Sequence, residues 1–424
     1  VYTLEATYTG FSPAAAEVST VGVPVADVVL SMETDAFMLD QVVVTSSKSE
    51  IRRRESPALV NVLPAKIFDR VGACSLADGL DFQPGVRVEN DCQNCGFTQV
   101  RINGLDGHYS QILVNSRPVF SALAGVYGLE HIPANMIERV EVMRGGGSAL
   151  FGSSAVGGTI NIITKDPTEN SAEVSHTLRS IGFTGALENN TTMNASLVTP
   201  NEKSGIFIYG QAHSRDGYDR NGDGFTEVPE INSQTVGARA FMRTTEASRL
   251  TAEYHNTHEY RRGGDNLDNP PHAAMIAEQA EHNIHSAELT FDLWPREHRD
   301  HLSVFGATQS TRRKSYYGSD MDPDAYGRTT DLVVTAGSQW THPFDRLWFM
   351  PSELVAGVEY SYNRLHDVTV GYGRDMLQNV NIYSAYLQNE WRDSRWGFLV
   401  GARVDKHSLI SRPIVSPRVN IRFN

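Results

Sequence analysis

The chain has 424 residues, of which 40% are hydrophobic, with a mean hydropathy of −0.33 and a formal net charge of −13. No stretch approaches the roughly 20 apolar residues that a membrane-spanning helix needs, which excludes a helical membrane protein. The acidic balance argues against nucleic acid as a partner, because nucleic-acid binding normally shows a basic surface. A transmembrane β-barrel is compatible with this composition, because only every second strand residue faces lipid.

The first 50 residues fall into two parts. Residues 1–35 contain short β-like runs, which we interpret as the remnant of an N-terminal β-sandwich whose start is missing. Residues 36–50 form a linker with an extended, β-branched run made of Asp40, Gln41, Val42, Val43, Val44 and Thr45. The first residue is Val1, and a strand pattern is still running at Asn424, so we expect a chain truncated at both ends.

Residues 51–168 mix helical and strand patterns and predict a small α+β domain. Ser75 is followed by a short helical run, as expected of a helix cap. Short strands are predicted at residues 100–103, 111–114, 139–143 and 161–164.

Residues 169–424 show repeated alternation of apolar and polar residues. Val400, Ala402 and Val404, for example, alternate with polar or small residues. We count about 12 such strands, each near the 9–11 residues that cross a bilayer at a tilt. Short turns near residues 200–203, 245–248 and 295–298 alternate with long polar connections near 214–233, 260–282, 316–330 and 363–378, as is typical of outer-membrane barrels. The predicted fold is therefore mainly β, with a partial transmembrane antiparallel β-barrel behind the α+β domain.

One long connection carries a calcium-type pattern. Residues 219–230 (DRNGDGFTEVPE) place oxygen-bearing side chains at the spacing of a calcium loop of about twelve residues. The candidate metal ligands are Asp219, Asn221, Asp223, Glu227 and Glu230. An acidic polar loop without an ion is the alternative, and no flanking helices are predicted.

Other metal signals are weaker. Cys92 and Cys95 form a single C-x-x-C, which is weak for zinc and better suits a local disulfide in an oxidising compartment. His282 and His285 are three residues apart, which places them on opposite faces of a strand, so that pair does not predict a metal site.

The middle of the chain resembles a known family. Residues 137–165 (IERVEVMRGGGSALFGSSAVGGTINIITK) resemble the plug-domain signature of TonB-dependent receptors, and residues 100–104 and 112–119 look like two further plug motifs. Asn115 and Ser116 replace the usual Asp-Gly of the second motif, and both pairs suit a turn. The family's barrel has about 22 strands around a plugged lumen, so the resemblance implies that further strands follow Asn424. Residues 1–35 are similar to the end of a carboxypeptidase-regulatory-like domain, as in Bacteroidetes-type receptors.

The resemblance also implies roles for individual residues. Residues 40–45 look like the TonB box, a segment that pairs as a strand with the TonB protein of the inner-membrane energy complex. By motif position, Arg101 and Arg144 of the plug would pair with barrel glutamates, for which Glu359 and Glu390 are candidates. Ligand contacts are expected in outward plug loops, from Cys92, Cys95, Phe97, His108, Tyr109 and Tyr127. Calcium in residues 219–230 would order an extracellular ligand-binding loop.

The expected function is TonB-dependent active transport of a scarce, bulky metal chelate, such as cobalamin, haem or a ferric siderophore, across the outer membrane of a Gram-negative bacterium. The expected partners are TonB, outer-membrane lipid, the chelate and a surface lipoprotein. A passive porin or a surface-binding barrel without energy coupling is the alternative. A secreted calcium-dependent enzyme is disfavoured, because the sequence contains no G-x-S-x-G, H-E-x-x-H or complete phosphate-loop motif.

Overall fold

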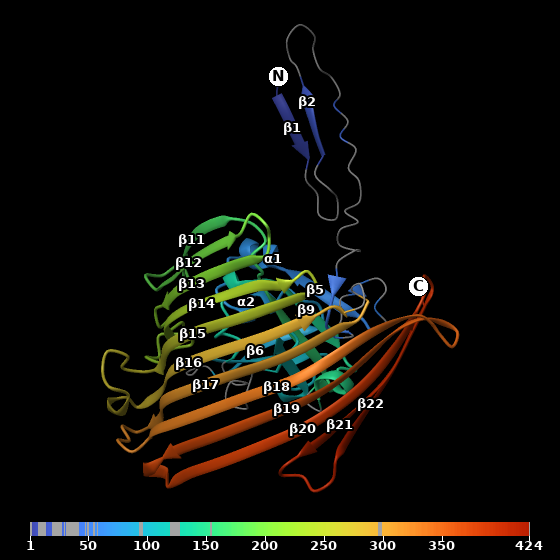
Figure 1. Cartoon of the computed structure of the whole chain (residues 1–424). Helices are drawn as coiled ribbons and strands as arrows, with labels where there is room; N and C mark the ends of the chain where they lie inside the picture. Colours follow the sequence, from blue (N-terminus) through green and yellow to red (C-terminus); the bar gives the residue numbers. More distant parts are fainter. Residues whose placement is uncertain are drawn as a thin grey trace.

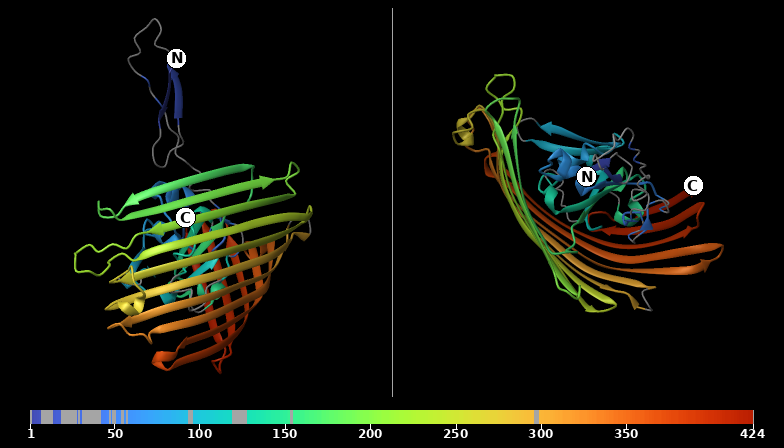
Figure 2. Two further views of the ribbon diagram at one scale, coloured as in Figure 1. Left: turned by 90° about the vertical axis from the view of Figure 1, so that its left-hand side faces the viewer. Right: turned by 90° about the horizontal axis from the view of Figure 1, so that it is seen from above.

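A computed structural model describes residues 2–6, 14–18, 28, 30, 42–46, 48, 51–53, 56, 58–92, 96–118, 128–152, 155–295 and 299–423. It contains one large curved sheet with a small α+β unit on its concave face, as the view from above shows (Figures 1 and 2). Within the described ranges, we find no helix that is both long enough and apolar enough to span a membrane.

The large sheet has twelve antiparallel strands in sequence order. They are β11 (Ser171–Ser180), β12 (Leu187–Val198), β13 (Ser204–Arg215), β14 (Glu230–Thr245), β15 (Ser248–Gly264), β16 (Ile276–Leu293), β17 (His301–Ser319), β18 (Tyr326–Leu347), β19 (Met350–Thr369), β20 (Arg374–Arg392), β21 (Trp396–His407) and β22 (Ile414–Phe423). Because each strand pairs only with its sequence neighbours, the sheet is the up-and-down meander of a partial barrel. The predicted fold class and strand number are confirmed.

The seven strands β14–β20 are longer than predicted, whereas β11–β13, β21 and β22 are close to the predicted length. β18 has 22 residues and β19 has 20, about twice the length needed to cross a bilayer. The additional residues continue the hairpins at the end where the connections are long, and they shorten those connections to residues 216–229, 265–275, 320–325 and 370–373. The sequence prediction was wrong on these lengths because paired strands satisfy their backbone hydrogen bonds beyond the lipid as well.

The α+β unit has a four-stranded mixed sheet in the order β5-β9-β10-β8. Its strands are β5 (Val60–Pro64), β8 (Ser110–Val114), β9 (Ile137–Arg144) and β10 (Gly158–Thr164), and a separate hairpin is formed by β6 (Val86–Cys92) and β7 (Phe97–Ile102). The helices of this unit are α1 (Ala65–Val71), α2 (Leu76–Leu80) and α4 (Ser148–Phe151), with short 3-10 turns at η2 (Gly107–Tyr109) and η3 (Ala134–Met136). Two further 3-10 turns, η5 (Pro271–Ala273) and η6 (Val370–Tyr372), lie in long connections of the large sheet.

The sequence explains how this unit folds. The carboxylate of Asp78 accepts hydrogen bonds from the backbone N–H groups of Cys74 and Ser75, which fixes the start of α2 where the helix cap was predicted. Val140 and Val142 of β9 are fully buried with the helices in the main core. After β9, Gly145 and Gly146 both have positive φ, which favours glycine and turns the chain into α4.

Two short sheets lie near the start of the chain. β1 (Tyr2–Ala6) pairs with β2 (Ala14–Val18), in the region where a β-sandwich remnant was predicted. β3 (Val42–Val43) pairs with β4 (Ile51–Arg52), so part of the predicted TonB box is a strand within this chain. Asp40 and Gln41 lie outside the described residues.

Candidate functional site

The segment that follows β3 is bound to a buried carboxylate of the α+β unit. Glu141 of β9 is fully buried, and its Oε2 accepts hydrogen bonds from Val44 N at 2.8 Å, Thr45 N at 2.9 Å and Thr45 Oγ1 at 2.7 Å. Arg139 Nε donates to the other oxygen at 2.9 Å. Val43 is also fully buried, so this conformation does not offer Val43–Thr45 to an outside strand, and pairing with one requires release from Glu141.

The linker is held by the large sheet as well. The Lys48 ammonium lies 2.5 Å from Glu359 Oε1 of β19 and 4.3 Å from the ring centre of Tyr386. Gln339 Nε2 donates to Lys48 O at 2.8 Å, and Arg418 Nη1 donates to Ser46 O at 3.0 Å. Residues 44–48 are therefore joined both to the α+β unit and to the sheet that surrounds it.

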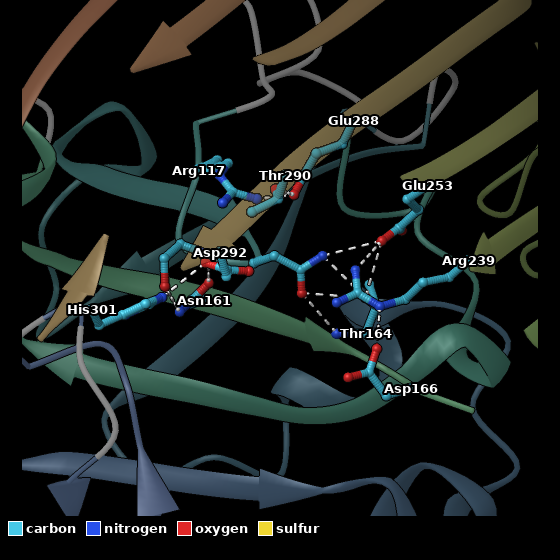
Figure 3. A network of polar contacts seen from close by, with 12 residues as sticks. Arg117, Asn161, Thr164, Asp166, Arg239, Glu253, Glu288, Thr290, Asp292 and His301 are labelled. Carbon is cyan, nitrogen blue, oxygen red and sulfur yellow. Dashed lines mark hydrogen bonds and ion pairs between the residues drawn. The ribbon is translucent and has the colours of Figure 1, made fainter. Parts of the chain in front are cut away.

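A network of ion pairs fastens the α+β unit to the sheet at the end with short turns (Figure 3). Asp166, which follows β10, binds Arg239 Nε at 2.5 Å and Arg249 Nη2 at 2.9 Å. Glu253 of β15 accepts from Arg239 Nη1 at 2.7 Å and from Asn115 Nδ2 at 3.2 Å. Each carboxylate thus contacts two groups, which fixes the position of the unit more firmly than an isolated surface pair would.

Two charged groups of this network have shifted pKa values. Burial raises the pKa of Asp166, but the guanidinium groups of Arg239 and Arg249 outweigh burial and hold it below its ordinary value. Burial lowers the pKa of Arg117 to about 10. Arg117 pairs with Glu288 of β16 and stacks on Phe305, so its charge is compensated within the interface.

The predicted plug arginines have other partners. Arg101 pairs with Glu89 on the adjacent strand β6 and lies 3.4 Å from Asp106, and Arg144 lies against the backbone at Gly85. The predicted pairing of Arg101 and Arg144 with barrel glutamates is therefore wrong, because groups inside the unit lie closer to both. Glu359 does contact the part of the chain inside the sheet, but its partner there is Lys48 of the linker. Glu359 also accepts a hydrogen bond from Arg403 at 2.8 Å.

The second predicted glutamate, Glu390, contacts Arg392 of its own strand at 3.2 Å instead. Sequence reasoning missed the contacts that join the unit to the sheet through Arg117 and Asp166, and those that hold the linker through Glu141 and Lys48. Of these four residues, Glu141 carries the clearest signal, because it is a carboxylate between the apolar residues Val140 and Val142.

A cavity of about 560 Å³ lies between the unit and the sheet beside this network. Lys48, Arg117, Arg239, Glu288 and Glu359 line it together with other polar residues. A polar cavity of this size has room for water, and water allows ion pairs to separate and re-form at low cost. The interface can therefore hold the unit in place and still let it move.

Those predicted ligand residues that the structure describes do not lie together. Cys92 Sγ donates to Glu278 Oε2 of β16 at 3.0 Å, so the tip of the β6–β7 hairpin reaches the end of the sheet with long connections. His108 and Tyr109 are exposed and follow the opposite end of β7, roughly 17–20 Å away. Cys95, Tyr127 and the side chain of Phe97 lie outside the described residues, so the predicted Cys92–Cys95 disulfide stays a prediction.

The calcium-type loop folds into a compact series of turns. Asp219 Oδ1 and Oδ2 accept from Gly222 N at 2.7 Å and Gly224 N at 2.8 Å, and these bonds lower the pKa of Asp219. Asp219, Asp223 and Glu227 each bring one oxygen within 4.8 Å of the others. Asn221 joins the turn through Asp223, whereas Glu230, the predicted last ligand, begins β14 and lies outside this cluster.

This loop meets the hairpin tip around a second cavity. Pro229 lies against Gly96, and both line a cavity of about 290 Å³ with Cys74, Glu130 and Glu259. Burial, followed by the charges of Glu188 and Asp78, raises the pKa of the Cys74 thiol to about 12, so this thiol is protonated at neutral pH. The molecule therefore has a polar cavity at each end, with the α+β unit between them.

Comparisons with known proteins agree with this architecture. Residues 52–159 match the model of the "TonB-dependent Receptor Plug Domain". The chain is 34% identical over 145 residues to the "Vitamin B12 transporter BtuB" of Photobacterium profundum, covering 34% of this chain and 24% of that protein. It is 28% identical over 224 residues to the "Ferric enterobactin receptor PirA" of Pseudomonas aeruginosa, covering 49% of this chain and 30% of that protein.

Solved structures extend the likeness to the large sheet. The siderophore receptor PirA from Acinetobacter baumannii superimposes with a TM-score of 0.73 at 19% identity, over 88% of this chain and 59% of that one. The matched part of the chain thus covers less than a third of the length of each of these two curated relatives and about three fifths of the length of the solved receptor. None of these matches tests the Bacteroidetes-type origin expected for residues 1–35, which stays a prediction. Residues 52–159 are thus similar to the plug domain of TonB-dependent receptors, and the chain shares the fold of solved siderophore receptors.

Proposed function

We propose that this protein takes up a metal-chelate nutrient across the outer membrane, driven by TonB pulling on residues 40–45. The observation that carries the proposal is the attachment of residues 44–48 to two bodies at once, the plug through Glu141 and the sheet through Glu359. A pull on the segment breaks these bonds first and then acts on the plug. Recognition by TonB through an added strand supplies main-chain hydrogen bonds to replace those lost.

The plug occupies the concave face of the sheet, which disfavours the passive-porin alternative (Figure 2). The polar contacts between plug, linker and sheet are separate, so together they retain the plug, but they can break one after another under an applied force. The cavity of about 560 Å³ beside the network gives the plug space to shift.

We propose cobalamin or a ferric siderophore as the substrate, because one similar protein is named a vitamin B12 transporter and another a ferric enterobactin receptor. Haem is a third chelate to be tested. Calcium bound by Asp219, Asp223 and Glu227 would order the loop beside the cavity of about 290 Å³, since carboxylate oxygens are the ligands that this ion prefers.

The test combines binding and uptake by the full-length receptor. Calorimetry with cobalamin, haemin and ferric siderophores, with and without calcium, identifies the ligand. Deletion of residues 40–45 is expected to abolish uptake in cells while leaving binding unchanged. Uptake that survives the deletion refutes energy coupling, and indifference to all three chelates refutes the proposed substrate class.

A further inference from the structure

Three metal-ligating side chains converge between the plug and the sheet, away from the linker. Glu259 of β15 and His282 of β16 are directly opposite each other across the strand pair. His131, in the plug loop before β9, lies over this pair, and all three residues are at most 8% exposed. Glu259 Oε1 is 3.1 Å from His131 Nε2 and 3.7 Å from His282 Nδ1.

The charges around this triad are unequal. Arg261 Nε lies 3.1 Å from Glu259 Oε1, but the same guanidinium pairs with Glu130 of the plug and donates to Gly96 O at 2.9 Å. Among the described residues, one arginine therefore faces two carboxylates, and a buried carboxylate requires compensation, which a bound cation would supply.

The geometry favours a bound metal. A tetrahedral zinc ion with ligands at about 2.0–2.2 Å separates those ligand atoms by about 3.3–3.6 Å. The two distances to Glu259 bracket this value closely, and the three ligand atoms lie within 4.8 Å of one another. The centres of the two imidazole rings are 4.9 Å apart and the ring planes meet at 62°, so a modest rotation of the rings lets one nitrogen of each ring bind the same ion.

We propose that His131, Glu259 and His282 bind a divalent transition metal, with Zn²⁺ as the reference ion, which links the plug to strands β15 and β16. Two imidazoles and one carboxylate are a ligand set that binds zinc in proteins, with a fourth position open to water. The cavity of about 290 Å³, which Glu130 and Glu259 line, gives an ion access from the end with long connections. The site does not depend on the proposed transport function.

The test uses the full-length receptor in detergent after removal of metals with a chelator. Co²⁺ is titrated as a spectroscopic substitute for Zn²⁺, and bound metal is counted by elemental analysis. A second cluster, formed by Cys74, Glu188 and His213, lies on the same cavity, so the titration is repeated in a Cys74→Ser background. With calcium in excess to occupy Asp219, Asp223 and Glu227, we expect one Co²⁺ bound in that background, with absorption bands of a low-coordinate nitrogen and oxygen site.

The variants Glu259→Gln and His282→Gln keep the side-chain size and are expected to weaken Co²⁺ binding by at least about tenfold. His285→Gln is the matched control, because His285 lies on the other face of the same strand, where it meets Tyr254, and is expected to bind as the parent does. His131→Gln tests the plug ligand separately, should a strand variant fail to fold. The proposal is overturned if the Cys74→Ser protein binds no stoichiometric Co²⁺, or if the triad variants bind Co²⁺ as tightly as the control does. His131, Glu259 and His282 would then be a hydrogen-bonded group without a metal.

Discussion

Substitution of Glu359 by glutamine is the sharpest perturbation of the linker. Glu359 faces both Lys48 and Arg403, and its side chain and that of Lys48 are about 7% and 6% exposed. In the variant, Arg403 keeps Asp405 at 2.7 Å, whereas Lys48 loses its carboxylate partner. An unpaired buried cation costs about 3–4 kcal/mol, which corresponds to a change of about 10²–10³-fold in the equilibrium between docked and released linker.

Hydrogen exchange measures this equilibrium at the amides of Val44 and Thr45, which donate to Glu141. We expect Glu359→Gln to lower their protection by about 10²–10³-fold, because the linker leaves the interface together with Lys48. Lys48→Met removes the cation and keeps an apolar chain between Phe151 and Tyr386. Adding Lys48→Met to Glu359→Gln should therefore restore part of the protection.

Two results would refute this reasoning. Unchanged exchange at Val44 and Thr45 in the glutamine variant would show that Glu359 does not hold the linker. Strictly additive effects of the two substitutions would show that Lys48 and Glu359 do not interact energetically. Ser361→Ala, on the same strand and face, is the control for a general loosening of β19.

Three further predictions concern other contacts. Asp166→Asn should destabilise the plug by about 1–3 kcal/mol at pH 7, because charged hydrogen bonds to Arg239 and Arg249 are lost. Because the folded-state pKa of Asp166 is lowered, this stabilisation is present above the unfolded pKa of about 3.9 and vanishes as the pH falls through the lower folded pKa. Melting curves of variant and parent should therefore converge only below about pH 4. Glu141→Gln should release the linker, because it removes a charged acceptor of three hydrogen bonds. Release would be measured as faster protease cleavage within residues 42–48, and equal cleavage rates in variant and parent would contradict this prediction. Asp223→Ala should abolish any calcium-dependent rise in melting temperature, whereas a rise of the same size in the variant would place calcium elsewhere.

The sequence predicted the architecture because the signals for it are local. Alternation along a strand shows in neighbouring residues, and it gave the number of strands. The ends of the strands could not be predicted in the same way. Outside the lipid both faces of a hairpin meet water, so alternation fades while the pairing of β18 with β19 continues.

The contacts of the site were less predictable because they join distant residues. Lys48 and Glu359 are 311 positions apart, and nothing in the sequence aligns them. The motif predicted that Arg101 pairs with a barrel glutamate, but Arg101 pairs with Glu89 on the neighbouring strand of the same hairpin. The faces of His282 and His285 were predicted correctly from strand geometry, but His131 and Glu259, which join His282, are supplied by other parts of the fold.

A reversible disulfide across the β3–β4 pair, with Val43→Cys and Ile51→Cys, tests the central claim most directly. Val43 and Ile51 are buried and directly opposite each other in this antiparallel pair, where Cα atoms lie about 4.5–5.5 Å apart and so within disulfide range, and each single-cysteine variant is a control. If release of the linker drives uptake, the oxidised double variant binds its chelate but does not transport it, and a reductant restores transport. Transport at the parent rate while the disulfide is intact would contradict the account.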